Sequence, residues 1–119
     1  MKFREITVNE NKILIGKDQE QNEALVKKYL GKENIIMHTV ASGSPFCVAT
    51  EKPTPKERRE IANLCASYSQ DWRDNQKDIK VHWFTGKMVH KEKGMKTGTF
   101  GVKKAKVIIA KKGEIEKCR

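Results

Sequence analysis

Seven short β-rich runs, interrupted by two helical patterns, constrain the possible fold more than any other feature of this sequence. The runs cover residues 3–8, 12–16, 34–39, 46–50, 79–84, 87–91 and 105–110. Because these strand candidates outnumber the helices and do not alternate regularly with them, we expect an α+β fold with a mostly antiparallel sheet rather than a doubly wound α/β fold. A length of 119 residues is sufficient for a single domain with a modest core.

Both helical patterns begin with capping residues. Asp18 is followed three residues later by Gln21, and Thr54 is followed three residues later by Glu57, with Pro55 at the first helical position. Each arrangement is a start signal for a helix. The second pattern carries its apolar residues on one face, at Ile61, Leu64, Cys65 and Tyr68. We therefore predict two helices packed against the sheet.

The end of the domain is expected close to the last strand. We assign residues 1–112 to one domain and residues 113–119 to a short charged tail. In the last strand, Ala105, Val107 and Ile109 alternate with their neighbours and are predicted to face the core. That register would hold Lys104 and Lys106 outward.

Most of the formal net charge of +10 is concentrated in one third of the chain. Residues 77–112 contain 11 Lys and Arg residues against 2 Asp and Glu residues, whereas residues 1–76 contain 12 against 11. A concentrated basic region attracts polyanions such as nucleic acid, an anionic membrane face or an acidic protein. The aromatic residues near this region, Trp83, Phe84 and Phe100, would suit base stacking, although core packing is the better explanation for each of them.

Catalytic and metal-binding signals are weak. The histidines His38, His82 and His90 are far apart and show no ligand spacing, so we expect neither a metal nor another cofactor. Cys47 and Cys65 lie within apolar patterns and are expected to be buried structural thiols. No apolar run approaches the roughly 18 residues of a membrane span, so we expect no membrane insertion and a cytoplasmic location.

Glycines punctuate the basic region without forming a nucleotide-binding motif. Gly94, Gly98 and Gly101 do not fit the Walker pattern, and they do not lead from a strand into a helix. A basic loop with glycines can still turn its backbone N–H groups toward a phosphate, because glycine permits close approach and positive φ angles. This use requires no catalysis.

Three ordered motifs carry a resemblance to a known family. They are GKDQEQNEAL at residues 16–25, ANLCASYS at residues 62–69 and VHKEKGMKTG at residues 89–98. Together they resemble the NFACT-R domain, the RNA-binding domain of NFACT ribosome-quality-control factors, which also occurs as small stand-alone proteins. A fourth motif departs from the family, which often has Trp-Phe-His followed by Asp and by Pro-Gly-Ser-His. This chain keeps His38, Gly43 and Ser44 but lacks the tryptophan, the aspartate and the second histidine.

The resemblance implies an RNA-binding role, with transfer RNA and the ribosome as the usual partners, and no established catalytic chemistry. We hypothesise that RNA phosphates contact the lysines and glycines of the basic region, and that a pocket edge adjoins them. The basic-region residues are Lys87, Lys91, Lys93, Gly94, Lys96, Gly98, Lys103, Lys104 and Lys106. The adjoining residues are Lys17, His38, Gly43 and Ser44.

Three other interpretations stay open at this point. The basic region could be a solvated face whose lysines keep two strands soluble. His38 and Ser44 could form an acid-base or anchoring pair in an RNA-modifying enzyme, since a histidine precedes a Gly-Ser turn. The basic surface could instead dock on DNA or on an acidic protein. The sequence does not specify an oligomeric state.

Overall fold

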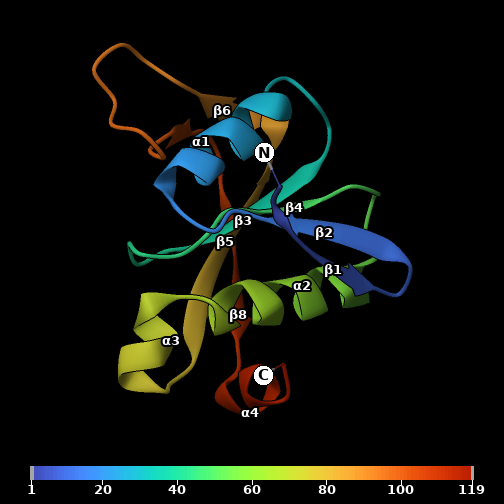
Figure 1. The fold of residues 1–119 in the computed structure, drawn as a ribbon. Helices are drawn as coiled ribbons and strands as arrows, with labels where there is room; N and C mark the ends of the chain where they lie inside the picture. The colour runs from blue at the N-terminus through green and yellow to red at the C-terminus, as the bar shows by residue number, and fades with distance from the viewer. Residues whose placement is uncertain (1, 119) are drawn as a thin grey trace.

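A six-stranded sheet lies between helices on both of its faces (Figure 1). The structure, a computed structural model, describes residues 2–118. The strands of this sheet are β1 (Arg4–Val8), β2 (Asn11–Ile15), β3 (Ile35–Thr39), β4 (Cys47–Ala49), β5 (Ile79–Thr85) and β8 (Lys106–Ala110). They lie in the order β1-β2-β4-β3-β5-β8, and every neighbouring pair is antiparallel. The predicted α+β class with a mostly antiparallel sheet is confirmed.

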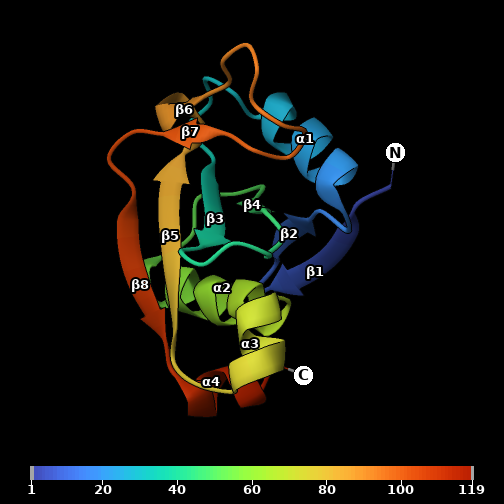
Figure 2. The same cartoon turned by 90° about the vertical axis from the view of Figure 1, so that its left-hand side faces the viewer.

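The two predicted helices form and cover opposite faces of the sheet. Helix α1 (Gln19–Lys28) begins where the side chain of Asp18 accepts a hydrogen bond from the backbone N–H of Gln21. Helix α2 (Pro55–Ser67) begins with a capping box between Thr54 and Glu57. In Figure 2, α1 lies above the sheet and α2 lies below it, together with the short helices α3 (Gln70–Asn75) and α4 (Lys112–Glu116).

Alternation along the strands divides the core into two clusters, one on each face. Neighbouring residues of β3 point to opposite sides, so that Met37 packs with Ile61 of α2 and Ile36 packs with Leu25 of α1. The cluster under α2 is centred on Ile13, Ile15, Met37, Ile61, Cys65, Ile79 and Val81. The cluster under α1 is centred on Leu14, Leu25, Val26, Ile36, Phe46, Val48 and Phe84.

The register of β8 differs from the prediction. Ile108 pairs with Val81 and packs against the α2-side cluster, whereas Val107 and Ile109 lie on the opposite face with 51% and 47% of their surfaces exposed. The prediction that Val107 and Ile109 are buried is wrong. The physical reason is that β8 is an edge strand that α2 covers from one side, so only residues in phase with Ala110 reach the core.

The region predicted as a strand at residues 87–91 bends before it pairs. A short 3₁₀ helix (Gly86–Met88) leads into β6 (Val89–His90), which pairs with β7 (Gly101–Val102) in a separate two-stranded ribbon. Gly86 allows the bend because a Cβ there would lie 1.9 Å from the carbonyl oxygen of Tyr29. Residues 91–104, called the basic loop below, connect β6 to β7 and continue past β7 toward β8; in both views their tip lies beside α1 (Figures 1 and 2).

Two further helices, α3 and α4, occupy segments in which no helix was predicted. Ser69 caps α3, and its hydroxyl accepts a hydrogen bond from the backbone N–H of Trp72. Helix α4 spans the junction between the expected domain and its expected charged tail, and its Ile115 is fully buried against the α2-side cluster. Within residues 2–118, no helix combines the length and apolar character needed to cross a membrane.

Candidate nucleic-acid interface

A groove of about 840 Å³ opens between the first turn of α1, the β3–β4 loop and residues 97–102. It extends to the junction of α2 and α3, where Gln70 and Arg73 line it. Of the residues that the sequence predicted as a binding set, five line this groove: Lys17, His38, Gly43, Ser44 and Gly98. Segments that are distant in the sequence therefore meet at one concave surface.

Aromatic rings form a row along the groove. The rings of Phe100 and Phe46 meet edge to face with centroids 5.8 Å apart, and the rings of Phe46 and His38 lie 4.4 Å apart with planes tilted by 30°. Phe46 is only 4% exposed, whereas His38 and Phe100 are half-buried. His82 continues the row, because it pairs in register with His38 across β3 and β5.

The His38 imidazole is held in its neutral form. Burial lowers the pKa of His38 below its ordinary value; backbone hydrogen bonds with Thr39 and Ser44 oppose this effect, and the nearby His82 adds to the lowering. A neutral ring in contact with Phe46 presents a flat surface rather than a cation at pH 7.

The hydroxyl of Ser44 is used within the β3–β4 loop. Its Oγ accepts a hydrogen bond from the backbone N–H of Thr39 at 3.0 Å and donates one to the carbonyl oxygen of Pro45, also at 3.0 Å. Gly43 has a φ of 90°, and its carbonyl oxygen accepts from the backbone N–H of Gln70 at 2.9 Å. Both residues therefore shape the wall of the groove.

The motif at residues 16–25 positions the other wall. The side-chain oxygen Oδ1 of Asn22 accepts from the backbone N–H of Phe46 at 3.0 Å. A Cβ on Gly16 would lie 2.1 Å from that oxygen, which explains the glycine. Gln21 Oε1 accepts from the backbone N–H of Lys17 at 3.0 Å and so fixes the backbone that carries the Lys17 side chain at the groove.

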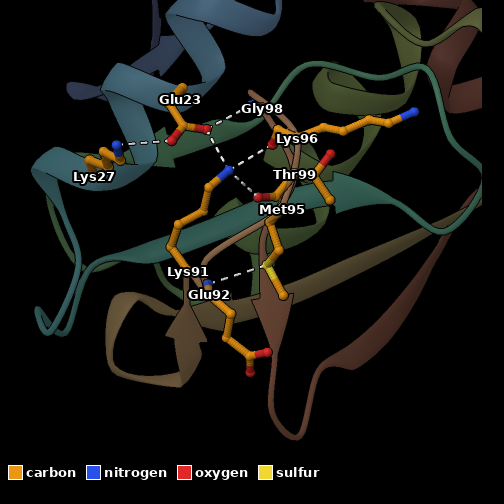
Figure 3. A network of polar contacts seen from close by, with 8 residues as sticks. All are labelled: Glu23, Lys27, Lys91, Glu92, Met95, Lys96, Gly98 and Thr99. Atoms are coloured by element: carbon orange, nitrogen blue, oxygen red, sulfur yellow. Dashed lines mark hydrogen bonds and ion pairs between the residues drawn. The ribbon is translucent and has the colours of Figure 1, made fainter.

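Glu23 and Lys91 tie the basic loop to α1 (Figure 3). The Lys91 Nζ donates to Glu23 Oε1 at 2.9 Å, to the Lys96 carbonyl oxygen at 2.7 Å and to the Thr99 carbonyl oxygen at 2.8 Å. Glu23 Oε1 also accepts from the backbone N–H of Gly98 at 2.7 Å. The side chains of Glu23 and Lys91 are only 16% and 18% exposed, so the ion pair lies between the loop and α1 rather than on the surface.

This arrangement changes the acidity of Glu23. Burial alone would raise the pKa of the Glu23 carboxyl, but hydrogen bonds from Lys91, Gly98 and Lys27 together with the charge of Lys27 outweigh burial and lower the pKa to about 2. Glu23 therefore remains ionised throughout the neutral range and keeps Lys91 in place.

The predicted lysines fall into three groups. Lys91 has its three donor positions occupied, and its ammonium also lies 4.7 Å from the centre of the Phe100 ring. Lys87 pairs with Glu33, and Lys106 lies over the Trp83 ring at 4.9 Å, on the face that α2 covers. The remaining members are exposed on the basic loop: Lys93, Lys96, Lys103 and Lys104. In Figure 3, the Lys96 side chain extends away from the Glu23–Lys91 pair.

Of the three aromatic residues near the basic region, one is placed for contact with a ligand. Phe100 lines the groove and is half-buried. Phe84 is buried in the α1-side cluster, and Trp83 packs toward the α2-side cluster with the Arg58 guanidinium 4.6 Å from its ring centre. Core packing accounts for Phe84 and Trp83.

The structure adds residues to the groove that sequence reasoning did not select. Arg4, Arg73 and His82 line it, but they come from three distant segments and share no motif. Glu23 could have been selected, because it stands within the motif at residues 16–25. Among residues 2–118, no three His, Cys, Asp or Glu side chains gather in a way that could hold a metal ion.

Comparison with known proteins places this geometry in context. The model of the family described as the NFACT protein RNA binding domain matches residues 1–104. The archaeal Rqc2 homolog aRqcH of Methanocaldococcus jannaschii is 28% identical over 109 residues, which cover 86% of this chain and 16% of that protein. The Drosophila melanogaster homolog of the ribosome quality control complex subunit NEMF is 33% identical over 100 residues, which cover 76% of this chain and 10% of that protein.

A solved structure shares the fold. The C-terminal part of the fibronectin/fibrinogen-binding protein from Streptococcus suis superposes with a TM-score of 0.81 and 22% sequence identity, over 97% of this chain and 47% of that one. The chain thus spans less than a fifth of the length of these two curated relatives and about half of this solved structure.

Proposed function

Because this chain belongs to the NFACT RNA-binding domain family, we propose that it binds RNA through the basic loop and the adjoining groove, without catalysing a reaction. The observation that carries the proposal is the set of exposed lysines on the loop, Lys93, Lys96, Lys103 and Lys104. Among residues 2–118, none of these four side chains has an acidic partner within ion-pair distance. Cations without local acids are available to phosphates.

The Glu23–Lys91 pair supports this role for the loop. Two hydrogen bonds to Glu23 hold the loop on α1, and two more from Lys91 close the loop on itself. This keeps the lysines of the loop in one arrangement, so less conformational entropy is lost when RNA binds. In this proposal Lys91 holds the loop in its conformation, and Lys93 and Lys96 contact the phosphates. Gly94 and Gly98, with φ angles of 96° and 81°, supply the turns on either side of Lys96.

The partner that fits best is transfer RNA or ribosomal RNA. Two curated relatives are a homolog of Rqc2 and a homolog of a ribosome quality control complex subunit, and these similarities motivate a ribosome-associated role for this chain. Such a role corresponds to a cytoplasmic location. DNA and acidic proteins are the competing ligands for the same charged surface.

Binding is favoured over catalysis by the state of the two candidate catalytic groups. The Ser44 hydroxyl is buried and makes hydrogen bonds to the backbone of its own loop, and His38 packs against Phe46. A general base must reach the proton that it abstracts, and among residues 2–118 no carboxylate orients this histidine in the way that a catalytic pair requires. The enzyme alternative predicts turnover of a bound RNA that His38→Ala abolishes without loss of affinity.

The salt dependence of binding tests the proposal. If about five lysines each neutralise a phosphate of single-stranded RNA, log affinity falls against log salt concentration with a slope on the order of 3 to 4. The double variant Lys93→Gln, Lys96→Gln should reduce that slope by about 1.4, or 0.7 per lost contact. Fluorescence anisotropy with a labelled RNA over a range of salt concentrations gives both slopes.

A matched control keeps the total charge change the same. Lys111 and Lys117 pair with Asp78 and Glu114 away from the basic loop, so the double variant Lys111→Gln, Lys117→Gln should leave the slope close to that of the wild type. Equal slopes for the wild type and the Lys93, Lys96 variant would show that these two lysines do not contact phosphates. Competition among transfer RNA, duplex DNA and an acidic peptide at physiological salt then separates the three ligand classes.

A further inference from the structure

The face of the sheet opposite α2 is only partly covered. Helix α1 packs over the row of Ile36 and Phe84, but the next row along the strands, His38 and His82 with Val107 of β8, is half-buried or exposed. The groove opens beside this uncovered part of the sheet, since both His38 and His82 line the groove. The uncovered region therefore presents rings and aliphatic groups.

Two rings of the aromatic row are accessible to a ligand, and a third supports them. Phe46 is buried between His38 and Phe100, in contact with both rings. Because Phe46 is tightly packed, it restricts the movement of the His38 and Phe100 rings. His38 and Phe100 keep part of their surfaces open to the groove. Preorganised rings lose little entropy when another planar group stacks on them.

The rim of the groove is cationic. Arg4, Lys17 and Arg73 line it, and of these Arg73 is already paired with Asp74 at 3.1 Å. The acidic residue of the lining is Asp18, whose Oδ1 already accepts the capping hydrogen bond from the backbone N–H of Gln21 at 2.8 Å. Lys17 is exposed and has no ion-pair partner within the part of the chain that the structure describes. A ligand with a planar apolar body and an anionic end thus meets complementary groups at both ends.

The volume of the groove suits a single unpaired nucleotide. A groove of about 840 Å³ lies within the usual range for pockets that enclose small molecules, roughly 300 to 1,000 Å³. Bases within a duplex have both faces covered by their neighbours, whereas bases in loops, bulges and single strands can turn outward and stack on protein rings. A basic surface alone would attract duplex and single strand alike.

We propose that the groove receives an unpaired base of the bound RNA, with one face stacked on the His38 ring, its edge against the Phe100 ring, and the attached phosphate at Lys17. This inference rests on the proposed RNA binding and specifies the part of the RNA that the groove recognises. Gln70 and Ser42 on the groove wall are the polar side chains placed to meet the edge of that base. The lysines of the basic loop contact the flanking phosphates.

The test compares two RNA hairpins that are closed by a non-nucleotide linker, so that neither has unpaired loop bases, and that differ by one bulged nucleotide. The bulged base is 2-aminopurine, whose fluorescence falls when it stacks on another ring. Wild-type protein should bind the bulged hairpin roughly tenfold more tightly than the fully paired hairpin, as expected for one base stacked on protein rings. The fluorescence of the bulged base should fall on binding. Equal affinities together with unchanged fluorescence would overturn the inference and leave the proposed RNA binding intact.

Variants of the two rings provide the second readout. His38→Leu and Phe100→Leu should each remove most of the tenfold preference, measured as the ratio of the two affinities, and His38→Phe should keep it because the ring is preserved. The matched control is His90→Leu, since His90 is also half-buried but lies outside the groove lining. Circular dichroism verifies the fold of each variant. If both leucine variants keep the full preference, the groove is not the binding site; failure of the wild type to bind either hairpin instead overturns the proposed function.

Discussion

A single lysine shows how charge and fold are linked in this domain. Lys91 belongs to the series of basic residues that the sequence marks as ligand contacts, yet its ammonium is turned inward to Glu23 and to two carbonyl oxygens of the basic loop. A lysine whose three donors are all used stabilises structure rather than attracting phosphate. Sequence reasoning could place Lys91 in the right segment, but only the fold brings Glu23 of α1 to it.

The Glu23→Gln variant measures what this pair contributes. At pH 7 we expect a loss of about 1.5 to 3 kcal/mol in the free energy of unfolding, the usual value of hydrogen bonds to a charged group. The pKa of Glu23 is lowered from 4.5 to about 2 in the folded state, so the carboxylate contributes stability above pH 4.5 that disappears as the pH falls through 2. Urea unfolding of both proteins at several pH values should show their difference shrinking across that window.

The control for this variant is Glu33→Gln. Glu33 pairs with Lys87, but both side chains are more than half exposed, so its removal should change the free energy of unfolding by less than about 1 kcal/mol. A stability difference between the Glu23→Gln variant and the wild type that stays constant down to pH 2 would show that the ionised carboxylate is not its source.

Single elements differ in how well the sequence predicts them. Helices α1 and α2 could be predicted because their caps and apolar faces are local patterns. The register of β8 could not, because alternation makes Val107 and Ile109 as suitable for the core as Ile108. Only the pairing with β5 and the position of α2 decide which set is buried. The groove could be predicted only in part for a similar reason. His38 and Lys17 lie in recognisable motifs, whereas Arg4 and Arg73 reach the groove only through the fold.

Adjacent alanine substitutions test the observed register of β8. Ile108→Ala removes a side chain packed against the α2-side cluster and should lower the free energy of unfolding by about 1 to 3 kcal/mol, somewhat below the cost at a fully buried site. Ile109→Ala serves as the matched control, because Ile109 is 47% exposed and should lose less than about 1 kcal/mol. Chemical denaturation of the two variants under identical conditions gives the order. The reverse order would restore the register predicted from the sequence.

The molecule as a whole is built around one sheet with a separate hydrophobic cluster on each face. Ile36 and Met37, neighbours on β3, belong to different clusters, and the same backbone hydrogen bonds hold both. Neither helix can keep its apolar face buried without the sheet. Loss of packing on the α1 face should therefore weaken the α2 face as well. The groove depends on this coupling, because the start of α1 lines it at one end and Gln70 and Arg73, next to α2, line it at the other.

Leu25→Ala tests whether the two clusters unfold as one unit. Leu25 is fully buried under α1, so its truncation should cost about 2 to 5 kcal/mol. The described tryptophans, Trp72 and Trp83, both pack on the α2 side, and their fluorescence therefore reports on the cluster that the substitution does not touch. In a cooperative domain, the fluorescence transition and the far-UV circular dichroism transition should shift together to the same lower urea concentration.

The reciprocal variant is Ile61→Ala, which truncates a fully buried side chain of α2. It should shift both signals by a similar amount, since the sheet transmits the loss in either direction. If Leu25→Ala moved the circular dichroism transition and left the tryptophan transition in place, the clusters would be independent. The proposed RNA binding by the basic loop would then be lost by local unfolding of α1 alone, because Glu23, which anchors the loop, lies on that helix.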